Sequence, residues 1–192
     1  MELIKQDDIN EYRMYRSKLV IDNQQQFIDE CHEAKTRFDV LFFPERSSTW
    51  LYRKYNMFSL TAGSVIFYNL FEEIKSLVRE HANHDNPLWF QSWMNFHMPN
   101  EVLDWHKHHH SIFHGYVSIL PHKTKTQFKN NLDFYELHNE VGNIYIGPSY
   151  KYHKVEVVEN YQTPRITIAF DIFDSSLKSI TKNNPALSIF PI

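Results

Sequence analysis

The pattern of apolar and polar positions changes character near Pro87. Before it, the clearest signal is a stretch in which apolar residues recur at helical spacing and charged residues fill the opposite face. The apolar positions are Phe67, Leu70, Phe71, Ile74, Leu77 and Val78. Thr61 or Ser64 can cap this helix, which should end before Pro87 because proline disfavours helical backbone at the residue preceding it.

Two further segments precede this helix. Residues 23–38 predict an earlier helix, with Asp22 or Asn23 as its cap. Residues 48–60 are rich in aromatic side chains and are predicted to be extended. The first part of the chain is therefore expected to be mostly helical.

After Pro87 the chain becomes a series of short apolar or alternating segments, which are separated by Pro, Gly, Asn or Asp. This spacing is typical of successive β-strands. The predicted strands are 88–97, 111–120, 131–137, 143–147, 151–158 and 165–173. Helices followed by many strands predict an α+β fold that is mainly β: a double-stranded β-helix, or jelly roll, with the N-terminal helices packed on one sheet.

With 192 residues and no repeat or linker, the chain is expected to form a single domain, 1–192. Residues 1–87 would provide mostly helical support, and 88–175 would form the jelly-roll core that carries the site. Residues 176–192 would form a C-terminal tail, whose apolar end, 189–192, is expected to dock on the domain.

Composition narrows the class of protein. The net charge of −3 gives no basic excess for binding nucleic acid. No apolar run is long enough for a membrane span, and the first residues lack the apolar region of a signal peptide. The single cysteine, Cys31, fits a reducing compartment, so the cytoplasm, of the cell or of an infected host, is the expected location.

Candidate chemistry begins with residues 105–116, which hold five of the twelve histidines. If this segment is a strand, Asp104, His106, His108 and His110 share one face, so His106 and His108 can chelate one ion. His153, which opens a later strand, is the candidate third ligand. The same histidine-rich text also fits a solvated surface loop.

The remaining histidines are assigned less specific roles. His109, His110 and His114 are expected to be structural or to support the ligands. His81, His84, His122 and His138 lie in polar, turn-like surroundings and are expected at the surface.

A second candidate lies on the last predicted strand. Arg165, Thr167 and Ala169 alternate with Ile166, Ile168 and Phe170, so the guanidinium shares a face with a hydroxyl and a small residue. An arginine in the mouth of a barrel needs an anion, and a carboxylate matches its fork in a bidentate way. The alternative is an arginine at the sheet rim that pairs with an acid of the protein.

Together these motifs resemble the 2-oxoglutarate/Fe(II)-dependent oxygenase superfamily over roughly residues 88–173, and in particular the oxygenases of this kind from phages and bacteria. The matching text is Trp93-Met94-Asn95, His106-Lys107-His108, His114-Gly115-Tyr116-Val117, the run from Gly142 to Ser149, His153-Lys154-Val155 and the run from Arg165 to Phe170. Order and spacing both agree with the family pattern.

The resemblance implies that His106 and His153 are metal ligands. Most of the superfamily has an acid two positions after the first ligand, where this chain has His108. His108 is the preferred third ligand because it keeps that spacing, and Asp104, Asp133 and Glu136 are the alternatives. Three neutral imidazoles would leave the metal one negative charge short of the family's site.

The resemblance further implies Fe(II) and 2-oxoglutarate as cofactors, O₂ as cosubstrate and ascorbate as a supporting reductant. Arg165 and Thr167 would hold the distal carboxylate of 2-oxoglutarate, with Asn95 and Tyr116 beside them. Trp93 and Ser118 would also line the cavity. The implied reaction couples oxidative decarboxylation of 2-oxoglutarate to hydroxylation of an unidentified protein side chain or metabolite.

Two alternatives stay open at this point. One is a degenerate jelly roll that binds a metal or ligand without turnover, and the other is a cupin-like three-histidine dioxygenase that uses no 2-oxoglutarate. Formation of a homodimer is also left open, and no nucleic acid or membrane partner is expected.

Overall fold

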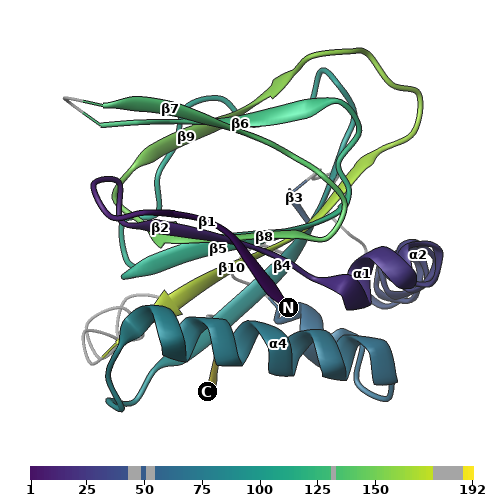
Figure 1. The fold of residues 1–192 in the computed structure, drawn as a ribbon. Helices are drawn as coiled ribbons and strands as arrows, with labels where there is room; N and C mark the ends of the chain where they lie inside the picture. Colours follow the sequence, from purple (N-terminus) through teal and green to yellow (C-terminus); the bar gives the residue numbers. More distant parts are fainter. Residues whose placement is uncertain (43–48, 51–54, 131–132, 175–187) are drawn as a thin grey trace.

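Two antiparallel sheets face each other in the computed structural model, which describes residues 1–42, 49–50, 55–130, 133–174 and 188–192 (Figure 1). The large sheet has the order β1-β2-β8-β5-β10-β4-β11, with β3 paired to β4, and the small sheet has the order β7-β6-β9. The large sheet contains β1 (Glu2–Asp7), β2 (Tyr12–Arg16), β3 (Thr49–Trp50), β4 (Trp89–His97), β5 (Phe113–Leu120), β8 (Asn143–Pro148), β10 (Arg165–Phe173) and β11 (Phe190–Pro191). The small sheet contains β6 (Thr124–Lys129), β7 (Phe134–His138) and β9 (Tyr152–Val157).

This arrangement confirms the predicted fold, a mainly β jelly roll with helices on one side. Every strand expected after Pro87 is present, within a few residues of its predicted ends, although residues 131–132 of the predicted strand 131–137 lie outside the described part of the chain. Between the predicted strands 111–120 and 131–137 the structure has a further strand, β6, which was not predicted. Its inward residues are Thr124, Thr126 and Phe128, and two threonines give little apolar alternation for a pattern to detect.

The sheet also begins earlier than expected. β1 and β2 form a hairpin inside the segment expected to be mostly helical, and β2 pairs with β8 in the large sheet. β1 is an exposed edge strand with mixed polar and apolar side chains, so it gives no core pattern. The jelly roll therefore includes residues well before position 88.

The helices are α1 (Lys18–Asp22), α2 (Gln24–Phe42), α3 (Met57–Leu60) and α4 (Val65–Ala82). Of the two predicted caps for α4, Ser64 is the one used, since its hydroxyl accepts from the Phe67 amide. The helix ends at Asn83, which adopts the left-handed conformation. The end before Pro87 is therefore confirmed.

The segment before α4 needed correction. Asp22 does not cap α2; it ends the short α1, whose own cap is Ser17, and Asn23 links α1 to α2. Residues 48–60 were expected to be extended, and β3 agrees, but 57–60 form α3 because the Asn56 side chain caps it. Residues 48 and 51–54 lie outside the described part of the chain.

The helices and the small sheet cover opposite faces of the large sheet (Figure 1). Apolar side chains of β4, β5, β8 and β10 pack beneath α4 and α2, and they form the larger core. A smaller cluster fills the space between the two sheets, and its members are Tyr12, Met14, Trp93, Tyr116, Phe128, Leu137, Tyr145 and Ala169. Alternate side chains of each strand therefore pack against the helices or point into the space between the two sheets.

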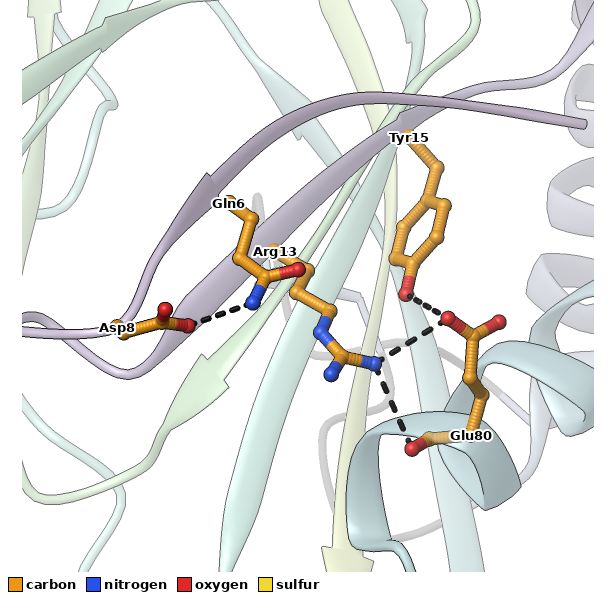
Figure 2. A network of polar contacts seen from close by, with 5 residues as sticks. All are labelled: Gln6, Asp8, Arg13, Tyr15 and Glu80. Carbon is orange, nitrogen blue, oxygen red and sulfur yellow. Dashed lines mark hydrogen bonds and ion pairs between the residues drawn. The ribbon is translucent and has the colours of Figure 1, made fainter.

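Polar contacts tie the N-terminal hairpin to α4 (Figure 2). Arg13 of β2 forms an ion pair with Glu80 of α4 at 3.2 Å, and the Tyr15 hydroxyl donates to the same carboxylate at 3.3 Å. Within the hairpin, the Gln6 side chain donates to Asp8. The contacts to Glu80 hold the added strands against the helix layer.

Residues 176–187 of the predicted C-terminal tail lie outside the described part of the chain, and its apolar end docks on the domain as predicted. Phe190 and Pro191 pair with Phe90 and Trp89 of β4, and the Ile192 amide donates to the Leu88 carbonyl. The Phe190 ring packs against Phe71 and Phe90. None of the helices in the described ranges is long and apolar enough to cross a membrane.

Candidate metal centre and its cavity

A cavity of about 300 Å³ opens between the two sheets. Its walls come mainly from the inward faces of β4, β5 and β10 and from the loop between β4 and β5. The lining residues are Trp93, Asn95, His97, Leu103, His106, Lys107, His108, His114, Gly115, Tyr116, Thr126, His153, Val155, Arg165, Thr167 and Ala169. This size is sufficient for a small organic ligand.

Three histidines gather at one part of this cavity. His106, His108 and His153 each offer a ring nitrogen, and these nitrogens all lie within 4.8 Å of one another. Backbone hydrogen bonds fix the loop that carries the first two, from the His106 amide to the His153 carbonyl at 3.0 Å and from the His108 amide to the Ser149 carbonyl at 3.1 Å. The structure therefore brings together the three side chains that the sequence selected.

The segment around His106 and His108 is not a strand, contrary to the prediction. Residues 98–112 form a loop, in which His106 makes an isolated bridge to His153 of β9. Asp104 and His110, which were expected on the same face, are exposed. The His106 and His108 side chains still converge because the bridge and the contact to Ser149 fix the loop on either side of Lys107.

Each of the three rings has its Nδ1 atom near an acceptor. His106 Nδ1 lies 2.7 Å from the Asp104 carbonyl oxygen, and His153 Nδ1 lies 3.3 Å from the Lys151 carbonyl oxygen. His108 Nδ1 lies 2.8 Å from a carboxylate oxygen of Asp171. Protonation at Nδ1 leaves the Nε2 lone pair of each ring available to a metal ion.

Burial favours the neutral imidazole at His106 and His153. It lowers the pKa of His106, and it holds the pKa of His153 well below the usual 6.5, with the neighbouring histidines adding to the effect. Because only a neutral imidazole ligates a metal, both side chains are ready to bind at neutral pH.

His114 is a fourth imidazole of this cavity. It is buried on β5, and its ring centroid lies 4.3 Å from that of His153 and 5.0 Å from that of His108. Burial holds its pKa well below 6.5. His114 lies outside the group of three converging nitrogens, which fits the expected supporting role.

The other histidines match their expected places only in part. His84 and His138 are exposed, as expected, whereas His122 is half-buried with its ring stacked on Tyr161. His109 and His110 were expected to be structural or to support the ligands, but both are exposed. His81 was wrongly assigned to the surface: its ring packs on Phe113, and burial lowers its pKa to about 4.

The alternative carboxylate ligands do not join the cluster. The Asp104 carboxylate accepts from the Trp105 amide, the Asp133 carboxylate accepts from the Asn130 side chain, and Glu136 pairs with Lys125. Within the described part of the chain, the one group of converging ligand atoms consists of the three histidines.

Arg165 occupies another part of the cavity wall. It is 3% exposed, and its guanidinium lies 3.5 Å from the Thr167 hydroxyl, which also accepts from Asn95 at 3.1 Å. Burial lowers its pKa, but an arginine remains a cation. No carboxylate of the described residues lies within ion-pair distance of Arg165, so the alternative of a rim arginine paired with an acid finds no support.

The other predicted lining residues are placed less uniformly. Asn95, Tyr116 and Trp93 do line the cavity, and burial raises the pKa of Tyr116 to about 12. Ser118 is buried on the same face of β5 but lies outside the lining.

His97 and Asp171 were not predicted from the sequence, and neither were the lining residues Leu103 and Thr126. His97 lines the cavity directly opposite Arg165 in the β4–β10 register, and burial lowers its pKa to about 3. Asp171 continues the alternation of Arg165, Thr167 and Ala169 on β10. Extending the two inward series, on β4 by two residues beyond Asn95 and on β10 by two beyond Ala169, would have found His97 and Asp171.

Aromatic and basic side chains hold the loop of residues 98–112, the ligand loop, against the outer face of the small sheet. The Lys129 ammonium lies 4.0 Å from the centre of the Trp105 ring, and that of Lys154 lies 5.1 Å from it. Lys107 lies over the Tyr152 ring at 4.8 Å. These contacts flank His106 and hold it beside β9.

Comparison with known proteins identifies the fold. No protein-family model matches the sequence, and no curated protein matches it. Among solved structures, the non-haem α-ketoglutarate-dependent carbocyclase SnoK from nogalamycin biosynthesis is similar with a TM-score of 0.62 and 9% identity, over 86% of this chain and 80% of that one.

Two further structures share the fold. HygX from Streptomyces hygroscopicus, solved with nickel and 2-oxoglutarate bound, has a TM-score of 0.60 and 13% identity, over 88% of this chain and 84% of that one. A prolyl-4-hydroxylase from Pseudomonas putida has a TM-score of 0.56 and 10% identity, over 87% of this chain and 94% of that one. This chain therefore has the jelly-roll fold of 2-oxoglutarate-dependent oxygenases.

Proposed function

We propose that this protein is a non-haem iron oxygenase that couples oxidative decarboxylation of 2-oxoglutarate to hydroxylation of a second substrate. His106, His108 and His153 would hold Fe(II), and Arg165 with Thr167 would hold the distal carboxylate of 2-oxoglutarate. The shared fold supports the class of enzyme. The finer resemblance to the enzymes of phages and bacteria stays a prediction.

The observation that carries this proposal is the position of Arg165. It is a buried cation without a carboxylate partner among the described residues, and it lines the same cavity as three converging imidazoles. A buried charge is costly unless it is paired, so this site favours an anionic ligand. The guanidinium fork suits a carboxylate in particular.

The donor set fits the proposed metal. Imidazole nitrogen is a common ligand of Fe(II), and three protein ligands leave positions open for other molecules. When bound, Fe(II) with 2-oxoglutarate and O₂ supplies the oxidising power for hydroxylation of a C–H bond. The protein's own part is to hold the metal, orient the cosubstrate and exclude water.

Water exclusion falls to the apolar side chains of the cavity. Trp93 and Ala169 line its floor on the large sheet, while Leu103 and Val155 contribute from the loop and from β9. The Asn95 amide donates to the Thr167 hydroxyl and so orients it beside Arg165. Tyr116 adds a second hydroxyl to the same wall.

The test is release of succinate from 2-oxoglutarate by the protein with Fe(II) and ascorbate, joined to separate binding measurements. His153→Ala should lose tight metal binding and succinate release together. Arg165→Met should keep the metal affinity but weaken 2-oxoglutarate binding roughly 10- to 100-fold, since hydrogen bonds to charged groups contribute about 1.5–3 kcal/mol.

Arg37→Met, at an exposed arginine of α2 outside this cavity, is the matched control and should bind the metal and 2-oxoglutarate as wild type does. The proposal fails if the purified protein binds no divalent metal, or if Arg165→Met binds 2-oxoglutarate as tightly as wild type.

A second candidate is a three-histidine dioxygenase that needs no 2-oxoglutarate. The set of three histidines favours this candidate. Arg165, which can bind a carboxylate, favours the 2-oxoglutarate-dependent oxygenase. Oxygen consumption that continues after 2-oxoglutarate is withheld would select the second candidate. A tight metal site without any turnover would select a binding module.

A further inference from the structure

Asp171 is a buried carboxylate directly behind the metal ligands. It is 1% exposed on β10, and its Oδ1 atom lies 2.8 Å from His108 Nδ1. The Ser111 hydroxyl donates to the same oxygen at 3.2 Å. Among the described residues, no lysine or arginine lies within ion-pair distance of Asp171, so its charge faces the imidazole of His108.

Asp171 does not belong to the cavity wall itself. Arg165, Thr167 and Ala169 precede it on the same face of β10 and do line the cavity, whereas Asp171 lies beyond them and outside the lining. A molecule in the cavity would therefore not meet this carboxylate. Its influence on such a molecule must pass through His108.

His108 differs from the other two ligands in this respect. The Nδ1 atoms of His106 and His153 face neutral backbone carbonyls, at 2.7 and 3.3 Å. His108 alone of the three has its Nδ1 atom beside a carboxylate, at ion-pair distance. The negative charge of this carboxylate favours the proton on Nδ1 and makes Nε2 a more basic ligand.

The charge balance of the site supports a role for this contact. Three neutral imidazoles bring no negative charge to a divalent metal. Asp171 places one carboxylate a single imidazole away, so the metal, the three histidines and Asp171 together carry a net charge of +1. A site with two histidines and one carboxylate has the same net charge.

We propose that Asp171 is a positioning residue that acts through His108 and supplies the negative charge that the three histidines do not bring to the metal. The inference rests on the metal site of the proposed function. It does not depend on 2-oxoglutarate, on turnover or on the identity of the substrate.

The experiment measures the affinity for Co(II) alone by titration, together with the visible spectrum of the bound ion. Asp171→Asn keeps a side-chain oxygen for the Nδ1 proton but removes the charge. It should weaken Co(II) binding roughly 10- to 100-fold, the range found for supporting partners of metal-binding histidines. The unfolding midpoint of the metal-free protein should stay unchanged or rise, because a buried charge has been removed.

A double-mutant cycle separates this role from a structural one. His108→Ala will itself weaken Co(II) binding, and Asp171→Asn added to it should have no further effect if Asp171 acts through His108. Ser92→Ala, which removes a buried hydroxyl on the helix side of β4, should leave the affinity within twofold of wild type. Ser111→Ala, which deletes one donor to Asp171, should weaken Co(II) binding roughly threefold. This variant replaces Asp171→Asn in the test if Asp171→Asn does not fold.

The proposal is overturned if Asp171→Asn binds Co(II) within twofold of wild type, or if its effect persists in the His108→Ala background. If wild-type protein releases succinate and Asp171→Asn binds metal normally, only this inference fails. If wild-type protein binds no divalent metal, the proposed function fails as well.

Discussion

His106 and His153 are joined by two backbone hydrogen bonds, of 3.0 and 2.8 Å, and their ring centroids lie 4.2 Å apart. This one-residue bridge is the point where the ligand loop meets β9. It sets one of the two loop histidines beside the strand histidine without a regular strand between them. Metal affinity should therefore depend on whatever holds the loop in place.

Trp105 offers a direct test of that dependence. Replacing it with alanine removes the ring that Lys129 and Lys154 contact, and cation–π contacts at exposed sites contribute about 0.5–1 kcal/mol each. We expect Trp105→Ala to weaken metal binding roughly threefold to tenfold with little change in the unfolding midpoint. Tyr68→Ala, at an exposed aromatic residue of α4, is the control. Unchanged metal affinity in Trp105→Ala would show that the bridge alone suffices.

Thr167→Val is expected to weaken binding of 2-oxoglutarate near Arg165 without changing metal binding at the three histidines. The hydroxyl accepts from Asn95 and lies near the Arg165 guanidinium, so its loss leaves the Asn95 amide without this acceptor and removes one donor for a bound carboxylate. A net contribution of about 0.5–1.5 kcal/mol predicts 2-oxoglutarate binding weaker by roughly twofold to tenfold. Calorimetry with Co(II)-loaded protein measures it, and the Co(II) affinity itself should not change. A parallel loss of metal affinity would contradict this prediction.

The strands after Pro87 were predictable because their apolar and polar sides differ. On β10, Ile166, Ile168 and Phe170 face the helices while Arg165 and Thr167 face the interior. β6 was not predicted because two of its core positions are threonines. The N-terminal hairpin was not predicted because its edge strand, β1, is exposed. In those segments tertiary pairing, and not a local pattern, decides the structure.

The site was predictable in its residues more than in its geometry. His106 and His108 were selected on the assumption that they lie on the same face of a strand. The segment is instead a loop, and its backbone contacts to His153 and Ser149 bring the two side chains together. The contact between His108 and Asp171 joins positions far apart in the sequence. The sequence could indicate that Asp171 faces inward, but which histidine it meets depends on how the loop folds back over β10.

Gly115→Ala should destabilise the fold. A Cβ atom at this position would lie 2.2 Å from Cζ of Phe170 and 2.3 Å from the Tyr145 carbonyl oxygen, and the second is backbone that cannot move aside cheaply. Overpacking of this kind costs about 1–3 kcal/mol, measurable as a lower free energy of unfolding in urea. Adding Phe170→Leu should relieve only the ring contact and not restore wild-type stability. A stability within 0.5 kcal/mol of wild type, a margin of about the size of ordinary surface substitutions, would refute the prediction.

The metal-free protein should lose stability as the pH falls below about 6.5. His97 has its pKa lowered to about 3 by burial, Arg165 and His106, and burial holds the pKa values of His114 and His153 well below 6.5. Between these values and the unfolded pKa of about 6.5, the unfolded chain binds more protons than the folded one, so the free energy of unfolding rises with pH. The stability that these neutral histidines confer is fully present above pH 6.5 and is lost as the pH falls toward their folded pKa values.

Each such histidine changes the free energy of unfolding by up to about 1.4 kcal/mol per pH unit in that window. Urea unfolding from pH 7.5 to 4.5 in the presence of a chelator measures the slope, and His97→Gln should make it shallower by the contribution of one proton. Metal binding should oppose the loss, because it stabilises only the folded protein and holds the imidazoles neutral. A metal-free protein that is equally stable at pH 5 and pH 7 would show that these histidines are not held neutral by the fold.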